Sequence, residues 1–295
     1  MGYLMERTWA KRTDELIEKA LVEDIGEGDL TTEAIVPPDL VLTARLFSKQ
    51  DGVLAGIDVA MKVFFTVDPS LETKILFKDG EIISHGQKIA EITGSVASIL
   101  KAERTSLNFL GRMSGIASKT ARFVKLINGC HAKILDTRKT MPTMRHLDKY
   151  AFRVGGGSNH RFGLYDMVLI KDNHIAAAGS IRIAVERAVS ALQEQDKQIN
   201  IELECKSYEE VLEAVYTPVD IIMLDNMEIQ EIEKSLHIIR QISTENDRTI
   251  RIEVSGNVNE SSVRTIADMG VDYISIGTLT HSVECHDFSL LFVEL

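Results

Sequence analysis

The hydrophobic and polar positions of the chain follow two different patterns. Residues 13–23 have apolar positions at helical spacing and run into a turn-rich Gly26–Asp29 segment, which predicts a helix and its end. From residue 41 to 92, short β-prone runs alternate with Gly-containing turns such as Asp51-Gly52 and Asp79-Gly80. This spacing is typical of antiparallel strands. A small β-rich domain is therefore expected in the first part of the chain.

The pattern changes after a long helical stretch from about Ile99 to Asn128. Apolar strands then alternate with amphipathic helical segments, of which 180–194 and 260–269 are examples. The predicted strands are 133–137, 167–170, 199–205, 220–224, 249–254 and 273–276. This alternation predicts an α/β fold with a parallel sheet, either open or closed into a barrel.

The composition matches an ordinary globular protein. The 295 residues are 44% hydrophobic and 26% charged, and no apolar run approaches the roughly 18 residues of a membrane span. The charged start indicates no signal peptide. The three cysteines are too far apart for a disulfide framework or a zinc motif. We expect a cytoplasmic protein that does not contact a membrane.

The basic charge is concentrated in one segment. The net charge is −11, yet residues 101–171 contain 14 Lys and Arg against 4 Asp and Glu. The acidic remainder would repel a long nucleic acid, so this balance favours a small polyanion held in a pocket. The Gly155-Gly156-Gly157 run does not join a strand to a helix, so the chain lacks a dinucleotide-binding fingerprint.

Polar residues follow nearly every predicted strand of the second region. Active sites of α/β barrels lie at the carboxyl ends of the strands, and idle buried polar groups are costly, so these ends are expected to converge on one site. The strand ends are Asp136–Lys139, Lys171–His174, Glu202–Glu204, Asp225–Asn226, Ser255–Asn257 and Gly277–Thr278.

Two of these acids are candidates for a metal site. Alternation along a strand places Glu202 and Glu204 on the interior face, opposite Cys205. Adjacent strands lie about 4.8 Å apart, so Glu204 and Asp225 are expected to approach one Mg²⁺ ion or one ribose diol. Oxygen ligands without a His or Cys cluster suit a hard cation better than zinc.

The positive side chains of the site require an anionic ligand, because buried unpaired charges cost several kcal/mol each. Arginine binds carboxylates and phosphates with two parallel hydrogen bonds, and lysine contributes a compact charge. The turns at Ser255-Gly256-Asn257 and Gly277-Thr278 are expected to present backbone N–H groups to a terminal phosphate. The candidate cations are Arg104, Arg138, Lys139, His160, Arg161 and Lys171.

Several motifs together resemble one family, nicotinate-nucleotide pyrophosphorylase, also called quinolinate phosphoribosyltransferase. The resemblance extends in order from Leu21 to Val283, nearly the whole chain. The motifs are ERTSLNFL at 103–110, LDTRKT at 135–140, GGGSNHR at 155–161, VLIKDNHI at 168–175, LDN at 224–226, EVSGN at 253–257 and GVDYISIGTLTHS at 270–282.

The resemblance implies a reaction and an architecture. The reaction is the magnesium-dependent transfer of phosphoribose from phosphoribosyl pyrophosphate to quinolinate with decarboxylation. Its products are nicotinate mononucleotide, pyrophosphate and CO₂, in NAD biosynthesis. The implied fold is an N-terminal α+β open-faced sandwich domain, residues 1–112, and a partly open α/β barrel, residues 113–295, whose C-terminal tail packs back on the first domain. A homodimer with shared active sites is also implied, with any higher assembly left open.

The resemblance also implies roles for individual residues. Arg104 would enter the partner's site, and Glu204 and Asp225 would face the ribose and magnesium. Lys139, Lys171, Glu204 and Asp225 are the expected catalytic residues. Arg138, His160, Arg161 and Lys171 would hold the quinolinate carboxylates, Lys139 and Lys171 the phosphates, and Ser255, Gly256, Asn257, Ile276, Gly277 and Thr278 the 5-phosphate, with Thr137 also in the substrate site.

Three alternatives remain open from the residues. Lys171 at a strand end is also a candidate for Schiff-base formation in a lyase. A paralogous phosphoribosyltransferase would act on another acceptor ring, and a non-catalytic protein would merely bind a polyanion. Gly111 and Met141 depart from the family's usual residues, which leaves the fine substrate preference undetermined.

Overall fold

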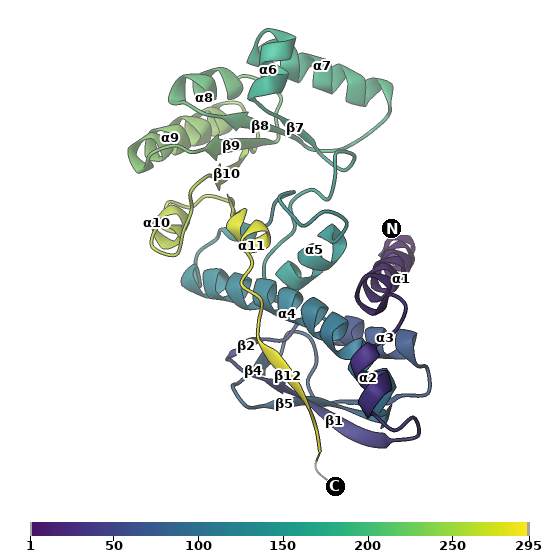
Figure 1. Ribbon diagram of the computed structural model, residues 1–295. Coiled ribbons are helices and arrows are strands. Elements are labelled where there is room, and N and C mark those ends of the chain that lie inside the picture. Colours follow the sequence, from purple (N-terminus) through teal and green to yellow (C-terminus); the bar gives the residue numbers. More distant parts are fainter. Residues whose placement is uncertain (1, 294–295) are drawn as a thin grey trace. The chain divides into compact units, whose positions relative to one another are not determined.

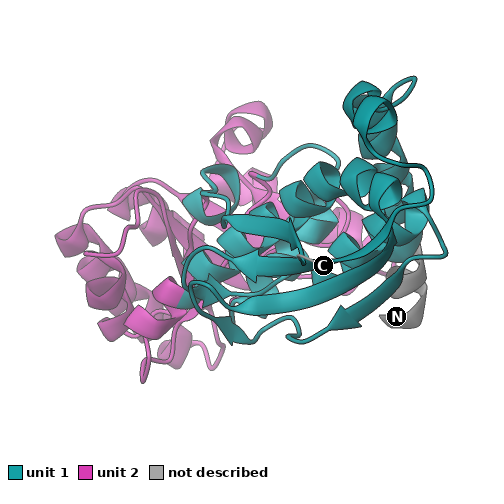
Figure 2. Cartoon of the chain, turned by 60° about the horizontal axis from the view of Figure 1, so that its bottom comes forward, with its two compact units in different colours: residues 1–121, 140–156, 278–295 teal, residues 122–139, 157–277 magenta. Residues whose placement is uncertain are grey.

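The computed structural model describes residues 2–293 and divides into two compact units (Figure 2). Unit 1 contains the chain up to residue 121, residues 140–156 and the residues from 278 on, and unit 2 contains 122–139 and 157–277. The predicted domain limit at residue 112 falls inside a long helix, α4 (Val96–Leu126), which continues from unit 1 into unit 2. Among the described residues, no helix is long and apolar enough to cross a membrane.

Unit 1 is built on an antiparallel sheet of four strands in the order β12-β1-β5-β3 (Figure 1). A separate two-stranded ladder joins β2 to β4. The strands are β1 (Val41–Ser48), β2 (Gly52–Val53), β3 (Glu72–Ile75), β4 (Ile82–Ile83), β5 (Lys88–Ser95) and β12 (Phe288–Phe292). The antiparallel strands predicted between 41 and 92 are thus confirmed.

The helices of unit 1 begin where local groups satisfy their free N–H groups. Asp29 accepts a hydrogen bond from the N–H of Thr32 and caps α2, while the Asp79 carboxylate accepts from the N–H groups of Gly56 and Ile57 at the start of α3. Besides α4, the helices are α1 (Gly2–Ile25), α2 (Leu30–Ile35), α3 (Ile57–Val67), α5 (Arg145–Val154) and α11 (Thr278–His281).

The C-terminal segment lies along α4 and then pairs with β1. A Cβ at Gly111 would stand 2.8 Å from the carbonyl oxygen of His286, and one at Gly115 would stand 2.2 Å from that of Glu284. The N–H of His286 donates to the Gly111 carbonyl. Because only glycine permits this approach, Gly111 serves chain packing within unit 1.

Unit 2 contains a parallel sheet of six strands in the order β6-β11-β10-β9-β8-β7. Figure 1 labels β7 to β10 of this sheet. Within residues 2–293 no ladder joins the end strands β6 and β7, as expected of a partly open barrel, and the predicted α/β class is confirmed. The strands are β6 (Lys133–Leu135), β7 (Val168–Ile170), β8 (Ile201–Cys205), β9 (Ile221–Asp225), β10 (Arg251–Ser255) and β11 (Tyr273–Ser275).

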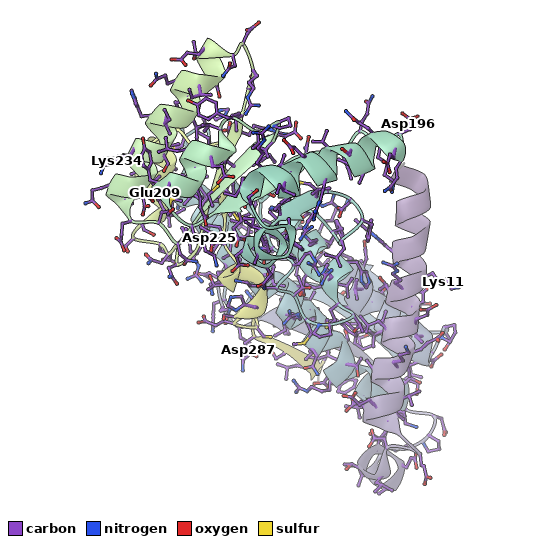
Figure 3. All side chains as sticks on the ribbon, turned by 90° about the horizontal axis from the view of Figure 1, so that it is seen from above. Lys11, Asp196, Glu209, Asp225, Lys234 and Asp287 are labelled. Atoms are coloured by element: carbon purple, nitrogen blue, oxygen red, sulfur yellow. The ribbon has the colours of Figure 1, made fainter. Side chains whose placement is uncertain are left out.

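Crossover helices connect most of these strands, as right-handed parallel connections require. Serine hydroxyls cap two of them, with Ser180 accepting from the N–H of Ile183 and Ser207 from that of Glu210. The helices are α6 (Asp172–Ala178), α7 (Ile181–Glu194), α8 (Tyr208–Ala214), α9 (Ile229–Glu245) and α10 (Val263–Asp268). Figure 3 shows charged side chains such as Glu209 and Lys234 on the outer helices of this unit.

Candidate active site

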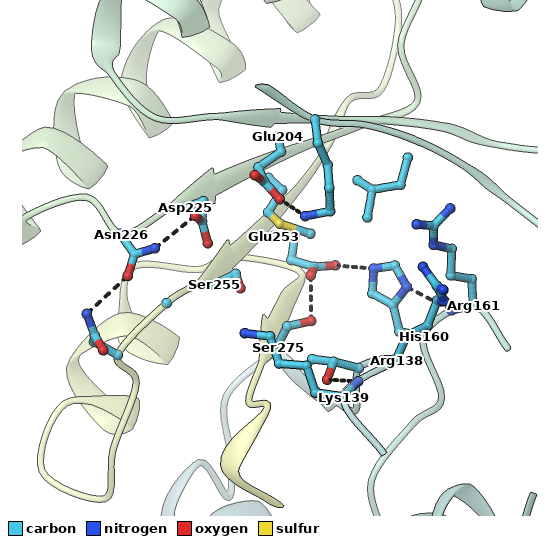
Figure 4. A pocket seen from close by; sticks show the side chains of 16 residues that line it. Arg138, Lys139, His160, Arg161, Glu204, Asp225, Asn226, Glu253, Ser255 and Ser275 are labelled. Carbon is cyan, nitrogen blue, oxygen red and sulfur yellow. Dashed lines mark hydrogen bonds and ion pairs between the residues drawn. The ribbon is translucent and has the colours of Figure 1, made fainter. Parts of the chain in front are cut away.

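A cavity of about 500 Å³ opens at the carboxyl ends of the parallel strands of unit 2. Each of the six strands contributes a side chain at or just beyond its end, as the sequence pattern predicts. The lining residues are Thr137, Arg138, Lys139, His160, Arg161, Leu169, Lys171, Glu204, Met223, Asp225, Asn226, Glu253, Ser255, Gly256, Asn257 and Ser275 (Figure 4). This volume lies within the range of about 300–1,000 Å³ that is usual for small-molecule sites.

The side chains of Arg138, Lys139, His160 and Arg161 lie together on one side of the cavity (Figure 4). Burial and the neighbouring Arg138 both lower the pKa of the Arg161 guanidinium below its ordinary value, while Glu202 and Asp166 act in the opposite direction. Arg161 also donates from Nη1 to the carbonyl of Met167 at 3.1 Å. Two guanidinium groups held close together favour an anionic ligand between them.

Lys171 and Glu204 join across neighbouring strands in an ion pair. Lys171 follows β7 as the residue before α6, and its N–H donates to Nδ1 of His174 at 3.0 Å. Glu204 is almost fully buried, with 7% of its side chain exposed. The pair therefore places a cation and an acid together at the cavity wall.

A second group of contacts fixes Asp225 at the end of β9. Nδ2 of Asn226 donates to the Asp225 carboxylate at 2.8 Å, and Nδ2 of Asn257 donates to Oδ1 of Asn226 at 3.1 Å. Gly256 has a φ of +92°, and a Cβ there would stand 2.3 Å from Oδ1 of Asn226. The glycine is thus required both by its backbone conformation and by the close Asn226 side chain.

The predicted interior placement of the acids agrees with the structure. Glu204 and Asp225 line the same cavity, and Cys205 is buried away from its lining. Two acids on adjacent strands, with the amide of Asn226 beside one of them, form an oxygen-rich set suited to Mg²⁺. The chemistry of these donors fits the expected metal.

Four predicted residues do not line this cavity. Arg104 is exposed on α4 and, like Thr278, belongs to unit 1. Ile276 is buried, and its N–H donates to the carbonyl of Leu135 at 3.0 Å within the sheet. Gly277 is the remaining predicted residue outside the lining.

The structure adds lining residues that the site prediction did not contain. Glu253 lies two residues before Ser255 and so shares its strand face, which is the signal that points to it. Ser275 at the end of β11 donates a hydrogen bond to Glu253. Asn226 follows Asp225 directly at the end of β9.

The fold and the cavity define an α/β enzyme whose site places several cations beside a pair of acids. Two family models match the chain: the N-terminal domain of quinolinate phosphoribosyl transferase over residues 29–114 and its C-terminal domain over 116–291. The chain belongs to the quinolinate phosphoribosyltransferase family, an enzyme family of the pentosyltransferase class.

Relatives across the whole chain agree with this assignment. The chain is 42% identical to quinolinate phosphoribosyltransferase [decarboxylating] 2b of Nicotiana tabacum, over 94% of this chain and 81% of the relative. It is 39% identical to the probable nicotinate-nucleotide pyrophosphorylase [carboxylating] of Bacillus subtilis, over 94% and 92%. The nicotinate-nucleotide pyrophosphorylase structure from Francisella tularensis matches with a TM-score of 0.88 at 38% identity, covering 96% of each chain.

Proposed function

We propose that the protein transfers phosphoribose from phosphoribosyl pyrophosphate to the nitrogen of quinolinate, with magnesium. Loss of the 2-carboxylate then yields nicotinate mononucleotide, pyrophosphate and CO₂. The observation that carries this proposal is the single cavity in which the cations Arg138, Lys139, Arg161 and Lys171 face the acids Glu204 and Asp225. A doubly carboxylated ring and a phosphorylated sugar together match that distribution of charge.

The cations bind and orient the two substrates. Arg138, Arg161 and Lys171 hold the quinolinate carboxylates, which directs the ring nitrogen toward the anomeric carbon of the sugar. Lys139 and Lys171 face the phosphates and stabilise the charge that develops on departing pyrophosphate. The turn at Ser255–Asn257 receives the 5-phosphate on its backbone.

The acids act on the sugar. Loss of pyrophosphate leaves a ribose with oxocarbenium character, and the carboxylates of Glu204 and Asp225 stabilise that positive charge. The same two residues would hold Mg²⁺, which supplies further charge neutralisation on the leaving group when it is bound. After nitrogen alkylation the cationic ring accepts the electron pair of the breaking carbon–carboxylate bond as CO₂ leaves, and that ring carbon then takes up a proton from solvent. The second step therefore requires little further help from the protein.

The functional unit is a homodimer in this proposal, with Arg104 of one chain completing the site of the other. The family resemblance supports it, and so does the exposed position of Arg104 on α4. The lyase alternative is disfavoured because Lys171 is engaged with Glu204, and a Schiff base would require its amine to leave that pair. A nicotinate-specific or other paralogous activity is distinguished by the acceptor assay below.

The test is a coupled assay with purified protein. We expect consumption of quinolinate only when phosphoribosyl pyrophosphate and magnesium are both present, with equal amounts of pyrophosphate and CO₂ released. Chelation of the metal should stop the reaction, and added magnesium should restore it. Equal use of nicotinate, or pyrophosphate release without quinolinate, would refute the assignment.

A further inference from the structure

Two glutamates of unit 2 are buried together next to the cavity. Glu202 on β8 and Glu253 on β10 both have 0% exposure, and β9 lies between their strands. Strand alternation points both side chains to the interior face, where the side chains of alternate barrel strands meet. Neither acid belongs to the ribose and magnesium set proposed above.

Polar atoms of three residues cluster around the two carboxyl groups. One oxygen of each glutamate and a ring nitrogen of His160 lie within 4.8 Å of one another, and Ser275 donates from Oγ to Oε1 of Glu253. Nε2 of His160 lies 3.0 Å from Oε2 of Glu202 and 3.5 Å from Oε2 of Glu253. Apart from these ion pairs, both oxygens of Glu202 and Oε2 of Glu253 are buried without a hydrogen-bond partner among the described residues, so the His160 ring is the group that faces them.

His160 connects this pair to the cavity wall. The ring Nδ1 of His160 accepts a hydrogen bond of 2.7 Å from the main-chain N–H of Arg161. The main-chain N–H of His160 donates to Oδ1 of Asp136 at 2.9 Å. An Nδ1 that accepts requires the hydrogen of the neutral ring to be on Nε2. Nε2–H is therefore directed at the glutamate pair, and both ring nitrogens have partners within the chain (Figure 4).

We propose that Glu202 and Glu253 are positioning residues that act through His160. The pair holds the imidazole by Nε2–H, and the imidazole in turn fixes the main chain of Arg161 so that its guanidinium faces quinolinate. In this arrangement His160 orients Arg161 and does not itself bind a substrate carboxylate. This inference rests on the proposed function for its kinetic test only.

The kinetic test uses glutamine, which keeps the size of the glutamate side chain and removes its carboxylate. In Glu202→Gln or Glu253→Gln, one carboxylate remains to hold His160, and we expect KM for quinolinate to rise about threefold or less. In the double variant no negative charge remains, and KM should rise about a hundredfold with a smaller change in kcat. If the two residues acted independently, KM of the double variant would rise by the product of the two single increases. The expected rise exceeds that product about tenfold, which is the size usual for directly coupled residues.

A matched control separates this effect from the loss of charge and of stability. Glu186→Gln with Glu209→Gln changes two exposed glutamates of the same unit, and KM for quinolinate should stay at the wild-type value. The buried double variant should unfold at a temperature no lower than the wild type, because it buries no charge. An unchanged KM in the double variant, or single variants each as impaired as the double, would overturn the proposal.

A second measurement does not depend on catalysis. The ¹⁵N NMR spectrum of labelled histidine should show the His160 ring protonated at Nε2 alone, with the signal assigned by its loss in His160→Asn. A ring protonated at Nδ1, or a metal ion bound stoichiometrically by His160 and the two glutamates, would overturn the inference. If the wild type does not consume quinolinate, the proposed function fails, and the NMR result still decides this inference.

Discussion

The ammonium group of Lys171 and the carboxylate of Glu204 form an ion pair across the neighbouring parallel strands β7 and β8. The lysine side chain is partly exposed to the cavity, while the glutamate is almost fully covered. Substrate binding therefore meets a cation whose position is already fixed by a buried acid. Such preorganised charge is the main source of transition-state stabilisation in many enzymes.

Replacement of this lysine tests its part in the reaction. Lys171→Met removes the charge that we propose faces pyrophosphate and a quinolinate carboxylate, and we expect kcat/KM to fall about a hundredfold or more. Steady-state kinetics with both substrates varied measures the change. Lys234→Met on the exposed face of α9 is the control (Figure 3), and equal losses in both variants would contradict the role of Lys171.

Gly256 provides a test of the phosphate end of the cavity. In Gly256→Ala the left-handed backbone is strained and the new Cβ collides with Asn226, which should move Asn226 away from Asp225. A misplacement of this kind is expected to lower kcat/KM for phosphoribosyl pyrophosphate about ten- to a hundredfold.

The matched control for this change is Gly80→Ala. Gly80 has a φ of +90° but no atom within 4 Å of the added Cβ. The Gly80→Ala variant should lose about 1 kcal/mol of its free energy of unfolding and keep the kinetic constants of the wild type. Equal kinetic losses in both alanine variants would show that the Asn226 contact is not the cause.

Asp148 connects several segments of unit 1 and should dominate its stability. It is fully buried, accepts two hydrogen bonds of 2.8 Å from Arg112, and accepts a third from the N–H of Met141. Asp148→Ala leaves the Arg112 charge without its partner and should reduce the free energy of unfolding by about 3–5 kcal/mol. Urea denaturation followed by circular dichroism measures this loss.

An exposed ion pair offers the comparison for Asp148. Glu186 and Arg182 are one turn apart on α7, with more than half of each side chain exposed. Glu186→Ala should change the free energy of unfolding by less than about 1 kcal/mol. A loss in Asp148→Ala as small as this one would contradict the structural role of the buried pair.

The burial of two histidines predicts how the free energy of unfolding depends on pH. Burial is the main cause that lowers the pKa of His146 and of His286 below the ordinary value of 6.5. The unfolded chain therefore binds more protons than the folded one between the lowered pKa and 6.5, so stability falls as the pH falls through this window. Above pH 6.5 these two histidines do not make the free energy of unfolding depend on pH.

Thermal unfolding between pH 5 and 8 tests this dependence. The pH-dependent loss of melting temperature should be smaller in His286→Gln than in the wild type, because the unfolded variant no longer takes up that proton. His131, which is exposed, is the control position. If the wild type, His146→Gln and His286→Gln all lose the same melting temperature as the pH falls, neither histidine is the source of the pH dependence.

Mixed inactive chains test the proposed sharing of sites. Arg104→Ala and Lys171→Ala are each expected to be inactive alone, and a mixture should regain activity because a mixed dimer contains one site built from two intact halves. Activity is measured after co-refolding, with mixed dimers verified by differently tagged chains. Absence of recovery in verified mixed dimers would count against shared sites.

The repeating pattern of strands and strand ends predicted much of the site. Each polar group was expected at the carboxyl end of a parallel strand, and residues such as Thr137, Lys171, Asp225 and Ser255 line one cavity there. Alternation along β8 alone was enough to assign Glu202 and Glu204 to the inner face. These features depend only on the local period of a strand and on the common direction of parallel strands.

Features that depend on register between strands could not be predicted. The hydrogen bond of Ser275 to Glu253 requires knowledge of how β11 pairs with β10. Ile276 was expected at the 5-phosphate, whereas its N–H donates to the carbonyl of Leu135 at the end of β6. Gly111 raised the question of substrate preference, but the structure explains this glycine by the close main chain of His286. Tertiary proximity of this kind leaves no periodic signal.

The pairing of β12 with β1 bears on how the protein is made. During synthesis β1 leaves the ribosome early, yet its neighbour β12 emerges only after every strand of unit 2. Until then β1 exposes an edge on which another nascent chain can add. Removal of residues 288–292 would make that exposure permanent, so shortened versions of this protein should precipitate before they lose any group of the reaction centre.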